Sequence, residues 1–296
     1  MDVAADPAIA IPSRHEGIGH RWRFHSWFDG NKDDAERFIS ISSSEIARYQ
    51  RLMYANGVKG SHRRLLIVLQ GMDASGKGGI VRHVFSQATR WHALSRFRRA
   101  KGEELDHDYL WRIKRELPNN GWISIFDRSH YEDIVMPRIY KTQPEEVWQA
   151  RYDEINRFES QLTADGCAII KIFLVVSKDE QKRHFLSRLD DPTKCWKFDP
   201  SDLEARARVG RYMAAWQDVF LRTSTEQAPW YLVPADNRWY SRAVVSELLR
   251  NTLKNMNMIC RRSKSTPTRC AVSWTRCSRR RQPRRWIVWC PGRRFR

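Results

Sequence analysis

The stretch Leu65–Phe85, "LLIVLQGMDASGKGGIVRHVF", constrains the fold of this chain more than any other part of its sequence. Its apolar start, Leu65–Leu69, is typical of a strand that is buried on both faces. A glycine-rich loop follows, and apolar residues from Ile80 to Phe85 then recur with helical spacing. A strand, a glycine loop and a helix in this order are the setting in which Gly-x-x-x-x-Gly-Lys binds phosphate.

The loop itself offers candidate ligands and lacks one common residue. Lys77 places a positive charge on the transferring phosphates. Gly78 stands where Ser or Thr normally contacts Mg²⁺, so the metal needs another ligand, and Asp73 is an oxygen donor that a hard cation accepts. A glycine-rich turn without a ligand is the alternative interpretation. The loop residues predicted to bind phosphate or nucleotide are Gly71, Ser75, Gly76, Gly78 and Gly79.

Length and composition limit the possible classes of protein. A chain of 296 residues, 41% of them hydrophobic, can form one large α/β domain or two small ones. No apolar stretch reaches the length of a membrane span, and the N-terminus resembles no signal peptide. The six cysteines form no C-x-x-C pair, which argues against a zinc ribbon and a disulfide scaffold. A reducing cytoplasm is therefore the expected location.

The positive charge is concentrated at the C-terminus. The net charge is +19, and residues 261–296 contribute twelve Arg and one Lys without any acidic residue. We expect a basic, disordered tail over residues 259–296, which binds nucleic acid non-specifically through its phosphates or has no role. Its bias to Arg, with three Trp and three Cys, also fits translation out of the ancestral frame.

Apolar runs alternate with amphipathic stretches along residues 43–258, which predicts a parallel sheet with helices on both faces. Residues 1–42 are interpreted as an N-terminal extension without a trusted periodicity. A lid over the carboxyl edge of the sheet is predicted at about residues 188–222, as a polar loop and a long charged helix. The predicted strands are Leu65–Leu69, "GWISIFD" ending at Asp127, "AIIKIFLVVS" and "PWYLVPA". The predicted helices cover Ser43–Asn56, residues 102–117, residues 142–162 with a Thr142–Glu145 capping box, and Ser241–Asn255.

Two of the predicted strands lead directly to an aspartate. Asp73 follows the first strand and Asp127 ends the second, and ligands of such sheets bind at the carboxyl ends of strands. Asp127 is thus the expected second Mg²⁺ ligand, with helix capping as the alternative. Arg128 and Arg138 follow and can neutralise phosphoryl oxygens, although Arg138 is equally compatible with a solvated surface. The neighbouring Ser129 and His130 are rejected as a nucleophile and base, because adjacent side chains rarely face one another.

Several long motifs together resemble the type 2 polyphosphate kinases. They are "LIVLQGMDASGKGGIVRHVFS", "EELDHDYLWRIKREL", "FDRSHYED", "YDEINRFE", "KIFLVVSKDEQKRHFLSRLDDPTKCWKF" and "TSTEQAPWYLVPADNRWY". The resemblance covers about Ser43 to Asn255 and implies a P-loop kinase-like three-layer α/β/α sandwich. It also implies reversible, Mg²⁺-dependent phosphoryl transfer between inorganic polyphosphate and a nucleotide, and Mn²⁺ can be expected to replace Mg²⁺. By position, it implies catalytic roles for Asp73, Lys77, Asp127, Arg128 and the lid residue Arg188, and phosphate binding by Lys194 and Lys197.

The sequence departs from the family pattern in three places. "QATRWHALSRFRRAK", residues 87–101, replaces a Pro-Gly turn and a short strand, and its five basic residues are costly to bury unpaired. We therefore expect this segment to loop outward and leave a strand weakened or missing. Pro137 is expected to end a helix that the family continues, and Gly210 to weaken the lid helix. An Arg-rich segment of this kind fits paired frame changes, with low activity as the consequence.

The expected reaction converts AMP or ADP, or a guanine nucleotide, with polyphosphate as the partner substrate, in a homo-oligomer. An ATP-dependent nucleoside monophosphate kinase would share the fold and the loop, but "FDRSHYED" and "APWYLVPAD" do not resemble that group. A weakly active relative whose basic tail binds nucleic acid is the other alternative.

Overall fold

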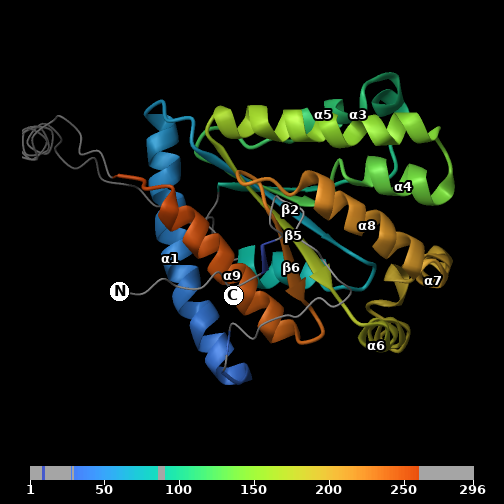
Figure 1. Cartoon of the computed structure of the whole chain (residues 1–296). Helices are drawn as coiled ribbons and strands as arrows, with labels where there is room; N and C mark the ends of the chain where they lie inside the picture. Colours follow the sequence, from blue (N-terminus) through green and yellow to red (C-terminus); the bar gives the residue numbers. More distant parts are fainter. Residues whose placement is uncertain (1–8, 11–27, 29, 86–90, 260–296) are drawn as a thin grey trace, which may run out of the picture. The chain divides into compact units, whose positions relative to one another are not determined.

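A twisted parallel sheet forms the centre of the molecule, with helices on both of its faces (Figure 1). The computed structural model describes residues 9–10, 28, 30–85 and 91–259. The strand order is β1-β6-β5-β2-β4-β3; β2 to β6 are mutually parallel, and β1 runs antiparallel to β6. The predicted α/β class and its three-layer α/β/α arrangement are confirmed.

The elements follow one another along the chain in an alternating order. The strands are β1 (Ile9–Ala10), β2 (Arg64–Gly71), β3 (His92–Arg96), β4 (Ile123–Asp127), β5 (Cys167–Val175) and β6 (Trp230–Pro234). The α-helices are α1 (Lys32–Val58), α2 (Lys77–Ile80), α3 (Tyr109–Arg115), α4 (Glu132–Tyr140), α5 (Glu145–Ala164), α6 (Lys178–Leu189), α7 (Pro200–Ala207), α8 (Val209–Thr223) and α9 (Arg238–Asn255). A π-helical turn η1 (Val81–Phe85) and the 3₁₀ turns η2 (Gly102–Asp106) and η3 (Cys195–Lys197) complete them.

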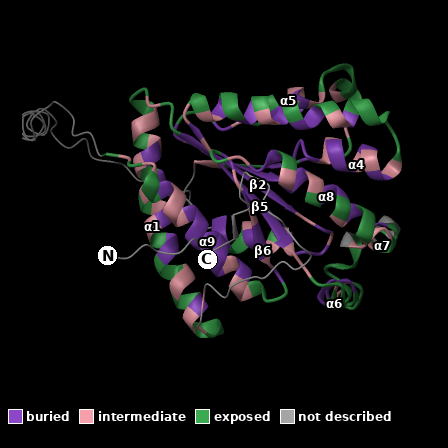
Figure 2. Ribbon diagram, in the orientation of Figure 1, coloured by how far each residue is buried: buried purple, intermediate pink, exposed green. Residues whose placement is uncertain are grey.

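Two hydrophobic cores lie on opposite faces of the sheet, because successive side chains of a strand point to opposite sides. Leu66 and Val68 of β2 pack with buried residues of α3, α4, α5 and α8. Leu65, Ile67 and Leu69 pack with those of α1, α2, η1 and α9. Figure 2 shows the buried strands between helices whose outer faces are exposed. β2 therefore reads as a continuous apolar run, as the sequence predicts.

The segment after residue 90 is an ordinary edge strand, so the prediction of an outward loop with a missing strand is wrong. β3 pairs in parallel with β4 and brings Arg96 beside Asp127. At the edge of a sheet a strand buries only part of its surface, and here Ser95 and Phe97 are buried whereas Leu94 and Arg96 are exposed. The cations of this segment that the structure describes thus need no burial. The remainder of the expectation, for residues 86–90, falls outside the described residues.

Pro137 lies inside α4 and does not end it, contrary to the prediction. Proline lacks the N–H that would bond to the carbonyl four residues earlier, that of Asp133. The guanidinium of Arg151 on α5 donates to this carbonyl oxygen instead. A hydrogen bond from a neighbouring helix thus replaces the one that proline removes.

Three helix boundaries also differ from the prediction. α1 begins at Lys32, eleven residues before the expected start, where Asn31 caps the helix by accepting from the backbone N–H groups of Asp33 and Asp34. The expected helix over residues 102–117 is divided into η2 and α3, because His107 adopts an extended backbone between them. The Thr142–Glu145 capping box is absent from α5, whose first turn follows Pro144 directly.

The predicted lid region contains two helices in place of one. α7 ends at Ala207, and α8 starts after Arg208, with Gly210 in its first turn. α8 buries Trp216 and Phe220 in the core and contacts α4 and α5, so it belongs to the body of the domain. The more exposed part of the region is confined to the end of α6, η3 and α7.

The predictions for the N-terminal extension before Ile9 and for the basic tail after Ile259 concern residues outside those described. Among the described helices, none is both long and apolar enough to cross a membrane.

Candidate active site

The phosphate loop forms a tight turn between β2 and α2. Gly71 has a φ of 146°, and a Cβ atom there would lie 2.6 Å from Ser75 Oγ and 2.9 Å from the carbonyl oxygen of Leu174, so a side chain would clash. Ala74 and Gly76 also have positive φ values, 63° and 98°. Such left-handed positions direct successive backbone N–H groups toward one side of the turn, which is a geometry that binds anions.

The loop keeps polar groups and space for a ligand. The hydroxyl of Ser75 is buried and has no hydrogen-bond partner among the described residues. Gly76 and Gly78 face open space, since a Cβ atom at either would meet nothing within 4 Å. A buried hydroxyl is rarely left unpaired in a folded protein. A phosphate oxygen would supply its partner.

Lys77 folds back over its own loop. Its Nζ donates to the carbonyl oxygens of Gly71 at 2.6 Å and Met72 at 3.2 Å. Burial lowers the pKa of Lys77, whereas the carboxylate of Asp73 raises it and limits the shift. The ammonium group is thus held near the loop, where an incoming phosphate can replace the carbonyl oxygens as its partner.

Asp73 and Arg128 form an ion pair across the site. Arg128 Nη2 donates to Asp73 Oδ1 at 2.7 Å, and both side chains are partly exposed. Burial alone would lower the pKa of Arg128, but the carboxylates of Glu132, Asp73 and Asp127 raise it above its ordinary value. Arg128 therefore remains charged. Its backbone has a φ of 66°, which turns the chain sharply after β4.

Asp127 ends β4 beside the last residues of β2. Its backbone is paired in register with Leu69, and its carboxylate is nearly buried. Arg96 Nε of β3 donates to Asp127 Oδ2 at 2.8 Å. The sequence predicted the place of Asp127 correctly, but its arginine partner was not foreseen.

Glu132 is a third carboxylate of this site, and the sequence analysis assigned it no role. It starts α4, and its Oε1 lies 3.0 Å from the side-chain amide nitrogen of Gln70 when that amide accepts from Ser129. Burial raises the pKa of Glu132, and the nearby Arg128 and Lys77 oppose this shift. Its position in the quoted motif "FDRSHYED" was the available signal.

The carboxylates fit a divalent cation in their chemistry. Asp73 and Asp127 come from adjacent loops, both interact electrostatically with Lys77, and both supply the hard oxygen atoms that Mg²⁺ prefers. In the described part of the chain, no three His, Cys, Asp or Glu residues already form a metal-binding group. Each of the two aspartates is paired with an arginine instead. A metal would therefore compete with Arg128 and Arg96 for these oxygens.

Helix α6 holds the backbone of the phosphate loop. Gln181 Nε2 donates to the carbonyl oxygen of Asp73 at 2.9 Å, and His184 Nδ1 lies 2.7 Å from that of Ala74. Arg238 Nε in turn lies 3.2 Å from His184 Nε2. These residues belong to quoted motifs, but their contacts with the loop are long-range and could not be derived from the sequence.

A basic edge borders the loop, which we define as Arg82, His83, Arg238 and Arg242. A guanidinium nitrogen of Arg242 approaches to 3.8 Å of the position that a Cβ atom of Gly79 would take. Burial and the positive charges of Arg238 and Arg82 lower the pKa of Arg242. Burial, Arg242 and Arg82 likewise lower the pKa of His83. Cations that repel one another in this way favour a polyanionic ligand.

The predicted lid residues lie apart from these contacts. Arg188 is in the last turn of α6, with its guanidinium 5.4 Å from the ring centre of Phe185. Lys194 is exposed and pairs with Asp191. The backbone of Lys197 lies in η3, and its side chain is outside the described part. None of these three contacts with described partners involves the phosphate loop.

Arg138 does not join the site. Its Nη1 donates to Asp218 Oδ2 of α8 at 2.5 Å, and its guanidinium lies 5.3 Å from the ring centre of Trp148. The expectation that Arg138 binds phosphate is corrected accordingly, because its position on α4 directs it toward α5 and α8. Ser129 and His130 are both fully buried, and Ser129 Oγ lies 3.0 Å from the amide of Gln70, which agrees with their rejection as a catalytic pair.

A glycine loop ending in lysine after the central strand, with two aspartates at neighbouring strand ends, defines a P-loop kinase-like protein. Comparisons with known proteins narrow this class. A family model described as "Polyphosphate kinase 2 (PPK2)" matches residues 30–261. The chain therefore belongs to the polyphosphate kinase 2 family.

Similar proteins extend this result. The chain is 41% identical over 234 residues to an AMP/ADP-polyphosphate phosphotransferase from Meiothermus ruber, covering 79% of this chain and 86% of that protein. It is 36% identical over 244 residues to an ADP-polyphosphate phosphotransferase from Rhodopseudomonas palustris, covering 78% and 83%. The crystal structure of polyphosphate kinase 2 from Arthrobacter aurescens TC1 superposes with a TM-score of 0.87 at 36% identity, over 93% of this chain and 99% of that one.

Proposed function

We propose that this protein transfers a phosphoryl group between inorganic polyphosphate and a nucleoside mono- or diphosphate, in either direction, with Mg²⁺ or Mn²⁺. The observation that carries the proposal is the joint position of Lys77, Arg128 and two carboxylates at adjacent strand ends, next to the basic edge. The names of the Meiothermus and Rhodopseudomonas relatives support the same pair of substrates.

Each group of the site has a role in this reaction. A terminal oxygen of the nucleotide forms a bond to the last phosphorus of polyphosphate, and the bridging oxygen leaves with the shortened chain. Lys77 and Arg128 neutralise the phosphoryl oxygens, and the backbone of the phosphate loop orients them. Asp73 and Asp127 would hold the metal ion, which adds positive charge to the phosphates when bound. The basic edge would bind the remaining polyphosphate chain.

The lid residues would act when substrates are bound. Arg188, Lys194 and Lys197 are proposed to contact the transferring phosphates, for which the segment carrying them would have to approach the phosphate loop. Their charge at the end of α6 and in η3 supports this role. A homo-oligomeric state, a cytoplasmic location and the choice among AMP, ADP and guanine nucleotides remain predictions from the sequence.

An assay of phosphate donors tests the function. The purified protein with Mg²⁺ and ADP or AMP should form ATP or ADP when long-chain polyphosphate is the donor. The competing function, an ATP-dependent nucleoside monophosphate kinase, requires ATP as donor for AMP and gives no product from polyphosphate. Turnover with ATP and AMP alone, and none with polyphosphate for either acceptor, would overturn the proposal.

A further inference from the structure

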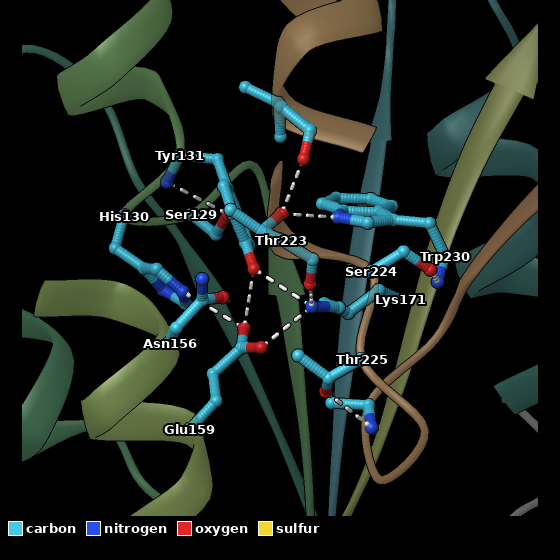
Figure 3. A network of polar contacts seen from close by, with 12 residues as sticks. Ser129, His130, Tyr131, Asn156, Glu159, Lys171, Thr223, Ser224, Thr225 and Trp230 are labelled. Carbon is cyan, nitrogen blue, oxygen red and sulfur yellow. Dashed lines mark hydrogen bonds and ion pairs between the residues drawn. The ribbon is translucent and has the colours of Figure 1, made fainter. Parts of the chain in front are cut away.

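A buried polar network joins four of the quoted sequence motifs, and the site described above uses none of its side chains (Figure 3). Its central residues come from α5, β5, the turn before α4 and the segment that leads into β6. They are His130, Tyr131, Glu159, Lys171, Thr223 and Trp230, and each is at most 2% exposed. Burying this many polar groups is costly unless each is paired, so the network requires an explanation.

Glu159 is the centre of this network. Its Oε1 accepts from the hydroxyl of Tyr131 at 2.7 Å and lies 3.3 Å from His130 Nε2. Its Oε2 accepts from Lys171 Nζ at 2.6 Å. Figure 3 shows the side chains of His130 and Tyr131 directed toward the same carboxylate. A single acidic group thus holds two consecutive residues of the turn before α4.

Lys171 completes the pairing. Its Nζ reaches Glu159 Oε2, the oxygen of Tyr131 at 3.0 Å and the carbonyl oxygen of Thr223 at 2.7 Å. An ammonium group has three donors, and all three have an acceptor here. Burial would raise the pKa of Glu159, but Lys171 and His130 lower it, so the carboxylate is ionised.

The held turn carries residues of the active site. Arg128 precedes His130 by two positions, and Glu132 follows Tyr131 directly. The other end of the turn is fixed to β2, because the backbone N–H of Arg128 donates to the carbonyl oxygen of Leu69 at 3.1 Å. Arg128 itself has a left-handed backbone, which most residues avoid. The turn is therefore anchored from both sides of the residue that contacts Asp73.

We propose that Glu159 is a positioning residue: by holding His130 and Tyr131 it fixes the turn that directs Arg128 toward Asp73 and the transferring phosphate. The kinetic part of this inference rests on the proposed function. The competing explanation is that the Glu159–Lys171 pair only stabilises the core. The two explanations differ in what happens when stability is restored without the acceptor at position 159.

Two double variants separate the explanations. Glu159→Gln/Lys171→Met and Glu159→Leu/Lys171→Met both remove the buried ion pair, and such replacements are often neutral or stabilising. They differ in one property, because glutamine still accepts a hydrogen bond from Tyr131 and leucine does not. Tyr131→Phe removes that hydrogen bond alone and serves if the leucine variant fails to fold. Arg64→Met, which removes a buried cation at the far end of β2, is the control for general destabilisation.

The kinetic outcome should follow the acceptor. At a temperature where all variants are folded, we expect the leucine variant to lose about tenfold or more in kcat, with a smaller change in KM. The glutamine variant should retain most of this activity, and Arg64→Met should not change kcat. In an Arg128→Ala background the leucine variant should cost little more, because its effect acts through Arg128. Equal kcat in both double variants, or fully additive losses with Arg128→Ala, would overturn the proposal.

Hydrogen exchange gives a readout that does not depend on activity. In the leucine variant and in Tyr131→Phe, the amides of residues 128–135 should exchange faster, while those of β2 and β5 keep their protection. In the glutamine variant all of them should resemble wild type. Unchanged exchange of residues 128–135 in both acceptor-less variants would show that Glu159 does not hold the turn, even if the protein proved inactive with polyphosphate.

Discussion

Arg96 and Asp127 are paired across neighbouring strands, with Arg96 Nε 2.8 Å from Asp127 Oδ2. The arginine comes from the segment whose basic residues were predicted to disrupt the sheet, and the aspartate is the expected metal ligand. The arginine thus occupies an oxygen that a divalent cation would need. The pair links a peculiarity of this sequence to the chemistry of the site.

Removal of Arg96 should make metal binding easier. In Arg96→Gln the carboxylate of Asp127 loses its competitor, and a partly exposed ion pair of up to about 1 kcal/mol corresponds to roughly fivefold in affinity. We therefore expect the Mg²⁺ concentration for half-maximal activity to fall by about twofold to fivefold. Arg98→Gln, at an exposed position of the same segment, is the control and should leave this concentration unchanged. A higher Mg²⁺ requirement in Arg96→Gln would mean that Arg96 supports the metal site.

Lys77 and Asp127 should be needed for catalysis more than for folding. We expect Lys77→Ala and Asp127→Asn each to lower kcat by at least about 100-fold, because both groups act mainly on charge in the transition state. Circular dichroism should be unchanged. Lys114→Ala, which removes an exposed charge from α3, should keep full activity. Turnover near that of wild type would exclude the substituted residue from the site.

The basic edge should bind the polyanion. In Arg242→Gln we expect the KM for polyphosphate to rise by about tenfold, the effect of losing one charged hydrogen bond, with little change for the nucleotide. Because neighbouring cations lower the pKa of Arg242, its removal should not reduce the melting temperature. Lys254→Gln at the exposed far end of α9 is the matched control. An equal rise of KM in both variants would indicate only a general charge effect.

The C-terminal tail should be dispensable for the reaction. Truncation after Ile259 removes thirteen positive charges. We expect nucleotide phosphorylation to be retained and salt-dependent retention on DNA to decrease, because that binding depends on counterion release. A loss of polyphosphate turnover in the truncated protein would instead place the tail in the substrate track.

The buried Glu159 carboxylate should make the fold sensitive to acid. Its pKa in the folded protein is below the ordinary value of 4.5, so the ionised form contributes stability above that pH. This contribution is lost as the pH falls through the lower folded pKa. Denaturant unfolding from about pH 6 down to about pH 3 should therefore show a steeper loss of stability in wild type than in Glu159→Gln/Lys171→Met. Parallel curves for the two proteins would contradict this assignment.

Local sequence patterns predicted the parts of the fold that depend on neighbours in the chain. The buried strand up to Gly71, the strand ending at Asp127 and the glycine loop were all recognisable from composition and spacing. The resemblance to a family added the roles of Lys77 and Arg128. These residues lie together in the structure because parallel strands end at the same edge of a sheet.

The errors concern contacts between residues that are distant in sequence. A strand at the edge tolerates charges that a central strand does not, and local sequence does not show which of the two β3 is. The helix around Pro137 continues because Arg151, on the next helix, donates to Asp133. Arg138 finds Asp218, eighty residues later, instead of phosphate. In each case the partner that decides the outcome is supplied by tertiary packing.

The position of β3 at the end of the sheet also bears on how copies of this protein meet. Among the described strands it has a neighbour on one side only, so its outer backbone groups could pair with the edge of another chain. Leu94 beside this edge is exposed and would favour such pairing. Arg96, Arg98 and Arg99 line the same segment, and two such edges would repel each other. The arginines that seemed harmful to the fold thus protect the sheet from growing beyond its own chain.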